Sequence, residues 1–299
     1  MAIWGIDLGG TKIEGVILSS LDDTTPIVRQ RIPTQGEKGY DHIISRIAEV
    51  LELLKSNSGL KPDQVGICTP GVLDPGSQTM KNCNSTALNG RPLLADLEKA
   101  LQIPVKMAND ANCFALAETH LGVVKQKAPH ARTVFGIIMG TGVGGGIVTD
   151  GKILEGRHGI AGEWGHNFLD ISGGPCYCGK TGCVETVIAG PSLERYYQQQ
   201  TGEKKLLRQM VADQHTDKYA ADTLERLYDQ FGRALSVVIN ILDPDAIVIG
   251  GGVGNVEDLY TQGKERLAHY IFNNRVEVPI LKPMLGDSAG VYGAAALVG

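Results

Sequence analysis

The chain has 299 residues, of which 42% are apolar and 20% are charged. This composition argues against disorder, and the length suits two domains better than one small core. The formal charge of -5 provides no basic face for nucleic acid or an anionic membrane, so the expected partners are small molecules. No basic segment precedes an apolar one at the N-terminus, and no apolar run reaches a spanning length. We therefore expect a cytoplasmic protein.

The first predicted elements form a hairpin. Apolar residues at 3–6 and 13–18 flank the segment Asp7-Leu8-Gly9-Gly10-Thr11-Lys12, which predicts a strand, a glycine turn and a second strand. Helical spacing of apolar residues over 40–54 then predicts a helix, and residues 65–67 read as a buried strand that ends in a turn.

A second hairpin repeats this design further along the chain. Residues 134–139 form an apolar run, residues 140–146 are rich in glycine, and Ile147 and Val148 resume the apolar pattern. The glycines satisfy G-x-G-x-x-G, but a dinucleotide site needs them to lead into a helix. Because β-branched residues follow instead, the pattern disfavours a dehydrogenase and suggests two lobes that open alike.

The last third of the chain predicts a helix, a strand and a final helix. Apolar spacing over 224–242 indicates a long amphipathic helix that stops at Asp243-Pro244. Residues 246–249 follow as a strand that ends in three glycines at 250–252. Residues 290–298 are small and apolar, and we expect them to form a helix that returns to the first lobe.

Both glycine turns suit phosphate binding. Glycines let the backbone approach phosphate oxygens, while Thr11, Thr141 and Lys12 add hydrogen-bond donors and Asp7 is available to hold hydrated Mg²⁺. Either turn alone is equally well explained as an ordinary tight hairpin. As a pair, they indicate a clamp on one triphosphate.

Asp110 is the candidate general base, because a hydroxyl that attacks a phosphoryl group must lose its proton. The alternative is that Asp110 caps the helix expected from Ala111 to Leu116. Further along, Glu163 and His166 are three residues apart and could face one ligand, although Glu163 could equally be a solvated surface carboxylate.

Three cysteines crowd into eight residues after His166. Cys176, Cys178 and Cys183 with that histidine provide the four ligands of a tetrahedral structural zinc site, and glycines 179 and 182 allow the chain to turn there. The remaining three cysteines are expected to be packing residues: Cys68, Cys83 and Cys113.

Together these motifs resemble the ROK group of sugar kinases and repressors in the actin/hexokinase superfamily. The matching segments are DLGGTK at 7–12, NST at 84–86, NDAN at 109–112, GTGVGGG at 140–146, GEWGH at 162–166, CYCGKTGCVE at 176–185 and IGGGV at 249–253. The resemblance implies an α/β, two-lobed actin/hexokinase-like (ribonuclease H-like) fold with a cleft between the lobes.

The implied lobes are residues 1–118, with the helix 287–299 packing back on them, and residues 119–286, with the zinc loop and dimerisation helices of a homodimer. The implied cofactors are ATP, Mg²⁺ and structural Zn²⁺, with Asp110 catalytic. The implied sugar residues are Asn84, Asn109, Asp110, Glu163, His166 and Glu185. The implied nucleotide residues are Asp7, Gly9, Gly10, Thr11, Lys12, Gly140, Thr141, Gly142, Gly251 and Gly252.

Within the family, the sequence at residues 81–90, 161–167 and 175–186 is most similar to that of bacterial fructokinases of the mannokinase type. This predicts phosphorylation of fructose, and also of mannose, at the 6-hydroxyl, with glucokinase or N-acetylglucosamine kinase as alternatives. Ala87 stands where such relatives often have an aromatic residue, and the polar stretch from Gln198 to Asp217 has no functional interpretation. A repressor is disfavoured because only six residues precede Asp7, while a non-catalytic sugar sensor stays open.

Overall fold

The computed structural model describes residues 2–273 and 275–299 and shows a mixed α/β protein. The chain folds into two compact units. Unit 1 consists of Met1–Pro129, Gly146–Ala161 and Met284–Gly299, and unit 2 of His130–Gly145 and Gly162–Pro283. This division differs from the lobes expected from the sequence, because residues 119–129, 146–161 and 284–286 group with unit 1.

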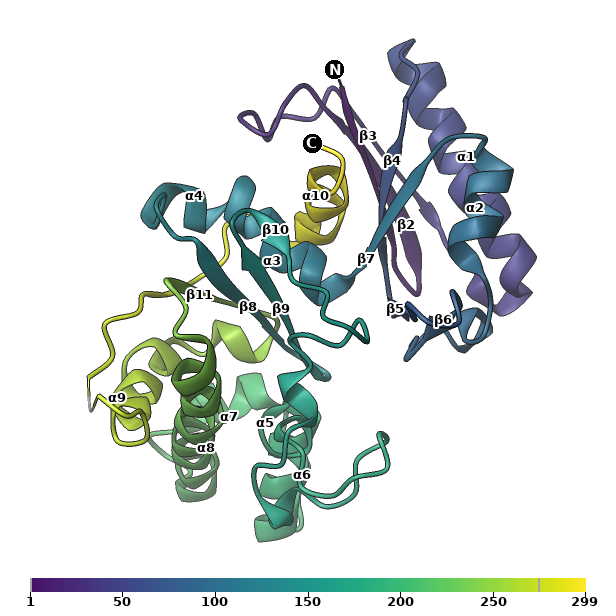
Figure 1. Cartoon of the computed structure of the whole chain (residues 1–299). Helices are drawn as coiled ribbons and strands as arrows, with labels where there is room; N and C mark the ends of the chain where they lie inside the picture. Colours follow the sequence, from purple (N-terminus) through teal and green to yellow (C-terminus); the bar gives the residue numbers. More distant parts are fainter. Residues whose placement is uncertain (1, 274) are drawn as a thin grey trace. The chain divides into compact units, whose positions relative to one another are not determined.

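Unit 1 is built on a five-stranded sheet with the order β3-β2-β1-β4-β7 (Figure 1). The first three strands, β1 (Ile3–Leu8), β2 (Lys12–Leu18) and β3 (Val28–Pro33), pair antiparallel. The strands β4 (Val65–Thr69) and β7 (Val105–Asn109) continue the sheet in parallel with β1. The predicted first hairpin and the strand near residue 65 are therefore confirmed.

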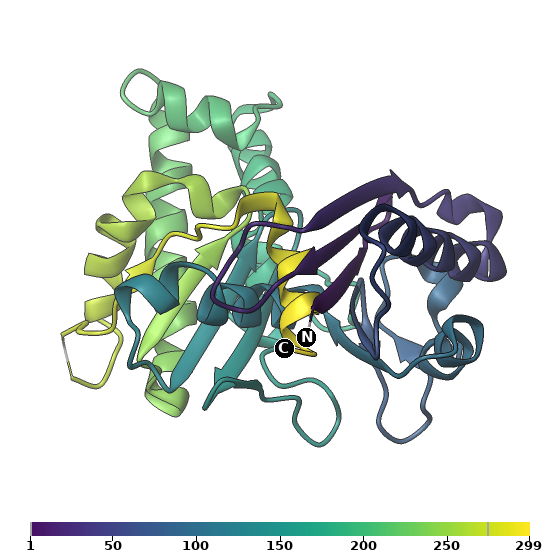
Figure 2. The ribbon, with the colours of Figure 1, turned by 90° about the horizontal axis from the view of Figure 1, so that it is seen from above.

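Helices cover both faces of this sheet. The helices α1 (Tyr40–Ser58) and α2 (Leu93–Leu101) lie on one face, and α3 (Asp110–His120) and α10 (Ala289–Ala296) lie on the other (Figures 1 and 2). The short helix α4 (Val123–Lys127) follows α3. The packing under α10 is close, since a Cβ on Gly66 would lie 1.8 Å from the Ala294 carbonyl oxygen and one on Gly293 would lie 1.9 Å from that of Cys113. The last residues of the chain thus pack against its first strands.

The second sheet has the order β10-β9-β8-β11-β12. Its strands are β8 (Thr133–Met139), β9 (Val143–Thr149), β10 (Lys152–Ile153), β11 (Ala246–Gly250) and β12 (Ile280–Leu281). The glycine-rich segment after β8 leads into β9 and not into a helix, as the sequence predicted. This geometry excludes the dinucleotide-binding interpretation of G-x-G-x-x-G.

The helices of unit 2 gather around one long helix, α8 (Lys218–Leu242). Its partners are α5 (Val184–Ile188), α6 (Gly190–Thr201), α7 (Leu207–Asp213) and α9 (Gln262–Ala268). The Asp217 carboxylate caps α8 by accepting hydrogen bonds from the amides of Tyr219 and Ala220. The polar stretch without an interpretation, 198–217, is therefore structural here: it completes α6, forms α7 and provides this cap.

Minor elements complete the structure. A small hairpin in unit 1 pairs β5 (Val72–Leu73) with β6 (Met80–Lys81). Short 3-10 turns occur at Gly36–Lys38, Thr86–Leu88, Trp164–His166, Ile171–Gly173, Val253–Asn255, Glu257–Tyr260 and Gly286–Ser288. Within the described ranges, the helices are all too short or too polar to cross a membrane.

Candidate active site

The turn between β1 and β2 is a tight glycine hairpin. The Gly9 amide donates to the Lys12 carbonyl oxygen at 3.0 Å, and the Thr34 hydroxyl donates to the Gly9 carbonyl at 2.7 Å. A further bond from the Thr34 amide to the Thr11 carbonyl oxygen, at 2.9 Å, holds the other side of the turn. The Lys12 ammonium lies 3.8 Å from the buried carboxylate of Glu14. The turn is thus rigid, and its lysine has a carboxylate partner in this structure.

Asp7 lies on β1 just before this turn. The start of α10 packs closely on it, because a Cβ on Gly290 would lie 2.9 Å from an Asp7 carboxylate oxygen. Burial raises the pKa of Asp7, a hydrogen bond from Cys68 opposes this, and the nearby carboxylates of Glu14 and Asp110 raise it further. Asp7 and Asp110, far apart in the sequence, are therefore close enough to interact electrostatically.

Asp110 is the first residue of α3, and the preceding residue, Asn109, caps the helix. The Asn109 side chain accepts the Asn112 amide at 2.9 Å, while the Asp110 carboxylate accepts the Ala111 amide at 2.8 Å. The expectation that Asp110 could be the cap is therefore wrong; Asn109 caps the helix and leaves the Asp110 carboxylate at its positive end. Asp110 is solvent-accessible, yet the surrounding protein displaces enough water to raise its pKa.

The raised pKa values of Asp7 and Asp110 predict a pH dependence. A base must be deprotonated, so kcat/KM should fall on acidification with a midpoint above the ordinary aspartate value of about 4. The effect on folding stability has the opposite sign to that of a salt-bridged aspartate, because the folded state binds these two protons more tightly than the unfolded state. The stabilisation by the two protonated carboxyls is therefore fully present below the unfolded pKa and is lost as pH rises through the folded pKa. A pH profile of kcat/KM with a midpoint at or below pH 4 would contradict this assignment.

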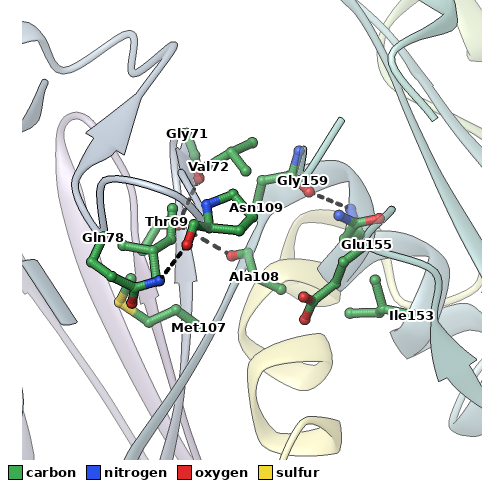
Figure 3. Close-up of a pocket in the computed structure, with 13 residues that line it drawn as sticks. Thr69, Gly71, Val72, Gln78, Met107, Ala108, Asn109, Ile153, Glu155 and Gly159 are labelled. Atoms are coloured by element: carbon green, nitrogen blue, oxygen red, sulfur yellow. Dashed lines mark hydrogen bonds between the residues drawn. The ribbon is translucent and has the colours of Figure 1, made fainter. Parts of the chain in front are cut away.

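A pocket of about 160 Å³ lies in unit 1 beside Asn109 (Figure 3). An apolar cavity of about 150 Å³ can hold a benzene ring, so this space suits a six-membered sugar ring or a substituent on one. Its walls combine apolar and polar side chains from the ends of β4 and β7, the β5–β6 hairpin and the segment after β10. They include Thr69, Val72, Gln78, Met107, Ile153 and Glu155.

Asn112 lines the same pocket, and the sequence did not single it out. Its Oδ1 atom is buried and has no hydrogen-bond partner among the described residues. A buried amide oxygen without a partner is unusual and calls for a water or ligand donor. Helical periodicity could have indicated that this side chain turns inward, but the pocket was not readable from local sequence. The same holds for Thr69, Gln78 and Glu155.

The second glycine turn lies between β8 and β9 in unit 2. The Gly140 amide donates to the Gly142 carbonyl oxygen at 2.9 Å, and the Gly190 amide donates to the Gly140 carbonyl oxygen at 2.8 Å. A Cβ on Gly140 would lie 3.8 Å from the Gly252 amide nitrogen. The glycine segments at 140–142 and 251–252, both expected at the nucleotide, are thus neighbours in the fold.

Gly251 has a φ of 84°, and a Cβ there would lie 2.2 Å from the carbonyl oxygen of Met139. Only glycine tolerates both this conformation and this contact at low cost. The strand end at β11 can therefore lie directly against the second glycine turn.

Glu185 links the second glycine turn to the predicted sugar residues. Its carboxylate accepts the Val143 amide at 2.9 Å, from the first residue of β9. A Cβ on Gly142 would lie 2.6 Å from the same carboxylate, so glycine makes room for it. The sequence assigned Glu185 to a sugar without any sign that it also holds this turn.

Glu163 and His166 lie on a loop that Trp164 anchors. The Trp164 indole donates to the Gly144 carbonyl oxygen at 3.1 Å and packs edge-on against Phe135, with ring centroids 5.8 Å apart. Glu163 directly precedes the 3-10 turn Trp164–His166 and His166 is its last residue, so the two candidate residues share one tight turn, not a longer helix. The loop is therefore firmly attached at the second glycine turn.

Tyr177 also belongs to this group, which the sequence did not indicate. Its hydroxyl lies 2.9 Å from His166 Nε2, and the two rings meet edge-on with centroids 5.1 Å apart. Partial desolvation, together with the carboxylates of Glu185 and Glu163, raises the pKa of Tyr177 to about 12. Unit 2 thus gathers two carboxylates, an imidazole and a phenol.

The expected zinc ligands come together in unit 2. The ligand atoms of His166, Cys176, Cys178 and Cys183 all lie within 4.8 Å of one another. The Cys178 and Cys183 sulfurs are 3.6 Å apart, and the Cys176 sulfur lies 3.6 Å from His166 Nδ1. A tetrahedral Zn²⁺ with Zn–S bonds of about 2.3 Å separates two sulfurs by about 3.8 Å. The group therefore has the dimensions of a closed zinc shell.

The chemistry of these thiols also fits a cation. Burial raises the pKa of Cys183 to about 12 and raises that of Cys176, so both are protonated at neutral pH without a positive charge beside them. A bound Zn²⁺ would deprotonate all three thiols and hold the turn at Gly179 and Gly182, whose φ values are 85° and 76°. The four ligands would leave no open position, so the metal would serve structure.

The predicted residues thus form two sets, one in each unit. Unit 1 brings together Asp7, Asp110, Asn109 and the first glycine turn, and the Ser85 hydroxyl lies 4.0 Å from the Cβ position of Gly10. Asn84 is exposed, and its amide bonds the Pro70 carbonyl oxygen at 3.4 Å. Unit 2 holds Glu163, His166, Glu185, the second glycine turn and the three cysteines expected to bind zinc with His166.

The ROK family model matches residues 3–299. The chain belongs to the ROK family. An N-acetyl-D-glucosamine kinase of Vibrio parahaemolyticus is 34% identical over 306 residues, with 98% of each chain covered. The crystal structure of a ROK hexokinase from Thermus thermophilus is 31% identical, has a TM-score of 0.88, and matches 99% of this chain and 97% of its own.

A ROK family glucokinase from Streptomyces griseus, solved with glucose and AMPPNP, is 26% identical with a TM-score of 0.77, and 99% of each chain is covered. These matches confirm the family and the α/β, two-lobed hexokinase-like fold class that the motifs predicted. Because they extend over almost the whole chain, the fold assignment does not depend on a few short motifs.

Proposed function

We propose that this ROK family protein is an ATP-dependent kinase that phosphorylates the 6-hydroxyl of a hexose. The observation that carries the proposal is the Asp110 carboxylate at the start of α3, close to Asp7 at the first glycine turn, on a helix start whose residues Asn109 and Asn112 line a pocket. Phosphoryl transfer needs a base, a phosphate-binding backbone and a metal-binding carboxylate. Unit 1 offers all three.

In the proposed reaction, the sugar O6 attacks the γ-phosphorus of ATP. The O6–P bond forms as the bond from phosphorus to the β,γ-bridging oxygen breaks, ADP leaves, and Asp110 accepts the hydroxyl proton. Asp7 would hold the hydrated Mg²⁺ that neutralises charge on the phosphates. Its raised pKa makes a cation partner favourable, because the metal would stabilise the charged carboxylate.

Unit 2 carries further groups that suit a sugar and a nucleotide. Glu163, Glu185 and His166 Nε2 are suited to sugar hydroxyls, because carboxylates and imidazole hydrogen-bond vicinal hydroxyls. Gly251 and Gly252, next to the second glycine turn, leave open backbone for adenosine. The zinc ligands would keep the His166 loop in place.

The sugar that we favour is N-acetylglucosamine. Relatives from Vibrio and Yersinia that are 33–35% identical over 98% of the chain are N-acetyl-D-glucosamine kinases. Fructose, which the short motifs ranked first, becomes the second candidate, supported by the NST segment at 84–86 and the LNG segment at 88–90. For the choice of sugar, we give similarity over the full length more weight than similarity of three short segments.

The unit 1 pocket suits an acetamido group. Val72, Met107 and Ile153 provide apolar surface for the methyl group, and the unpartnered Oδ1 of Asn112 would accept the amide hydrogen after a small rotation of its side chain. A fructose or glucose hydroxyl would leave the apolar part of this pocket unfilled.

A sugar panel with ADP-release detection tests the proposal. N-acetylglucosamine should give a kcat/KM at least about 10-fold above those of glucose, mannose and fructose, the discrimination expected from a pocket that selects one group. Fastest turnover of fructose would make the second candidate correct. Release of ADP with none of these sugars, while the folded protein binds ATP, would overturn the proposed function.

The homodimer that the family resemblance implies is part of the same proposal. Light scattering on the purified protein should give twice the mass of the 31.9 kDa chain. A mass of one chain at micromolar concentration would contradict it.

A further inference from the structure

Tyr177 lies between two zinc ligands on the surface of unit 2. The residue is 74% exposed, yet its hydroxyl makes a 2.9 Å hydrogen bond with His166 Nε2. The ring does not pack into the core; it meets the imidazole edge-on, at a centroid distance of 5.1 Å. The tyrosine is therefore held mainly by its contact with His166.

The two nitrogens of His166 have different partners. Nδ1 faces the Cys176 sulfur at 3.6 Å, inside the group of zinc ligands. Nε2 is consequently the only ring nitrogen that can reach a sugar, and with a metal on Nδ1 it carries the proton and donates it. In this structure the Tyr177 hydroxyl is already hydrogen-bonded to that nitrogen.

The Tyr177 hydroxyl is hydrogen-bonded to one residue that the proposed function assigns to the sugar, His166, and lies within electrostatic range of two more. The carboxylates of Glu163 and Glu185 both act on it electrostatically from within unit 2. These carboxylates and His166 are the groups that the proposed function assigns to the sugar. One phenolic oxygen therefore lies among the acceptors and the donor that would recognise a substrate oxygen.

We propose that the Tyr177 hydroxyl holds the position of a sugar hydroxyl on His166, and that sugar binding displaces it. The inference rests on the proposed sugar kinase activity but on no particular sugar. A sugar can bond His166 Nε2 only in those molecules in which the hydrogen bond to Tyr177 is broken. The apparent sugar affinity therefore equals the intrinsic affinity multiplied by the fraction of such molecules. Tyr177 would thus set the sugar concentration range in which the enzyme works.

The test is the variant Tyr177→Phe, which removes the competing oxygen and keeps the ring. A neutral hydrogen bond changes an equilibrium constant by a factor of about 2 to 12, so the sugar KM and the calorimetric sugar Kd should both fall by that factor. The value of kcat and the KM for ATP should stay the same, because Tyr177 has already left in the ternary complex. A merely structural role would not lower the sugar Kd selectively.

The control is Tyr219→Phe, which alters an exposed tyrosine at the start of α8 and should leave every constant unchanged. Zinc content should also be equal in the wild type and in Tyr177→Phe. An unchanged or raised sugar Kd in Tyr177→Phe would overturn the inference while leaving the kinase activity of the wild type intact. Failure of the wild type on every sugar is a different result and would remove the proposed function itself.

A crystal structure with bound sugar gives an independent answer. We expect the hydroxyl of Tyr177 to have left His166 Nε2 and a sugar oxygen to have replaced it. Persistence of the 2.9 Å contact beside a bound sugar would rule out the exchange.

Discussion

Asp110→Asn should lower kcat by about 10² to 10⁴-fold, the usual contribution of a general base. The amide is nearly the same shape and keeps its oxygen for the Ala111 amide, so α3 should still begin at the same residue. Sugar binding should be largely retained, because the variant removes proton acceptance and not the pocket. Steady-state turnover and calorimetric sugar binding, measured on one preparation, separate the two effects.

The same variant should be more stable than the wild type at neutral pH. The raised pKa of Asp110 shows that the fold disfavours its charged form, so replacing the charge by an amide removes a cost in the folded state. Thermal unfolding at pH 7.5 should show a higher Tm, and the difference should shrink on acidification as the wild-type carboxyl becomes protonated.

The matched control is Asp63→Asn, an exposed aspartate before β4 in the same unit, which should preserve turnover and Tm. Full activity of Asp110→Asn would show that another group takes the proton. Loss of both turnover and sugar binding would instead indicate that Asp110 mainly holds the substrate.

Cys183→Ser should release the metal and loosen the loop that carries His166. Cys183 is fully buried, and its backbone pairs with Phe168 while its sulfur lies 3.6 Å from that of Cys178. With only three ligands left, zinc affinity should drop steeply, and the loop that carries His166 and Tyr177 should lose its order. We expect a sugar KM raised at least about 10-fold, given that even outer partners of a metal site matter by about 10 to 100-fold.

Elemental analysis provides a readout that does not depend on activity. The wild type should contain about one zinc per chain, Cys183→Ser should contain far less, and Cys83→Ala, which alters a buried cysteine outside the group, should match the wild type. Hydrogen exchange should increase around residues 166–183 in the metal-poor protein and not in unit 1. A wild type that is fully active and free of metal would disprove the structural role of zinc.

The sequence determined the features that depend on neighbouring residues. Both glycine turns run from strand to strand, because β-branched residues on either side favour extended backbone. Cys176, Cys178 and Cys183 can meet because they lie within eight residues and glycines allow the tight turn between them. The family, the fold class and the clustering of these cysteines with His166 could therefore be predicted from short segments.

The tertiary structure decided which partner each side chain has. The sequence left open whether Asp110 caps α3; in the structure β7 ends at Asn109, and the Asn109 side chain caps the helix instead. The Glu185 carboxylate accepts the Val143 amide only because α5 and β9, far apart in the sequence, pack together, whereas Lys12 and Glu14 pair as alternate residues of one strand.

The contact between Tyr177 and His166 is of the same kind, as is the pocket beside Asn109. Local sequence sets backbone preference and spacing, which act over a few residues. Contacts between distant segments depend on how the whole core packs, so these contacts emerged only from the folded chain.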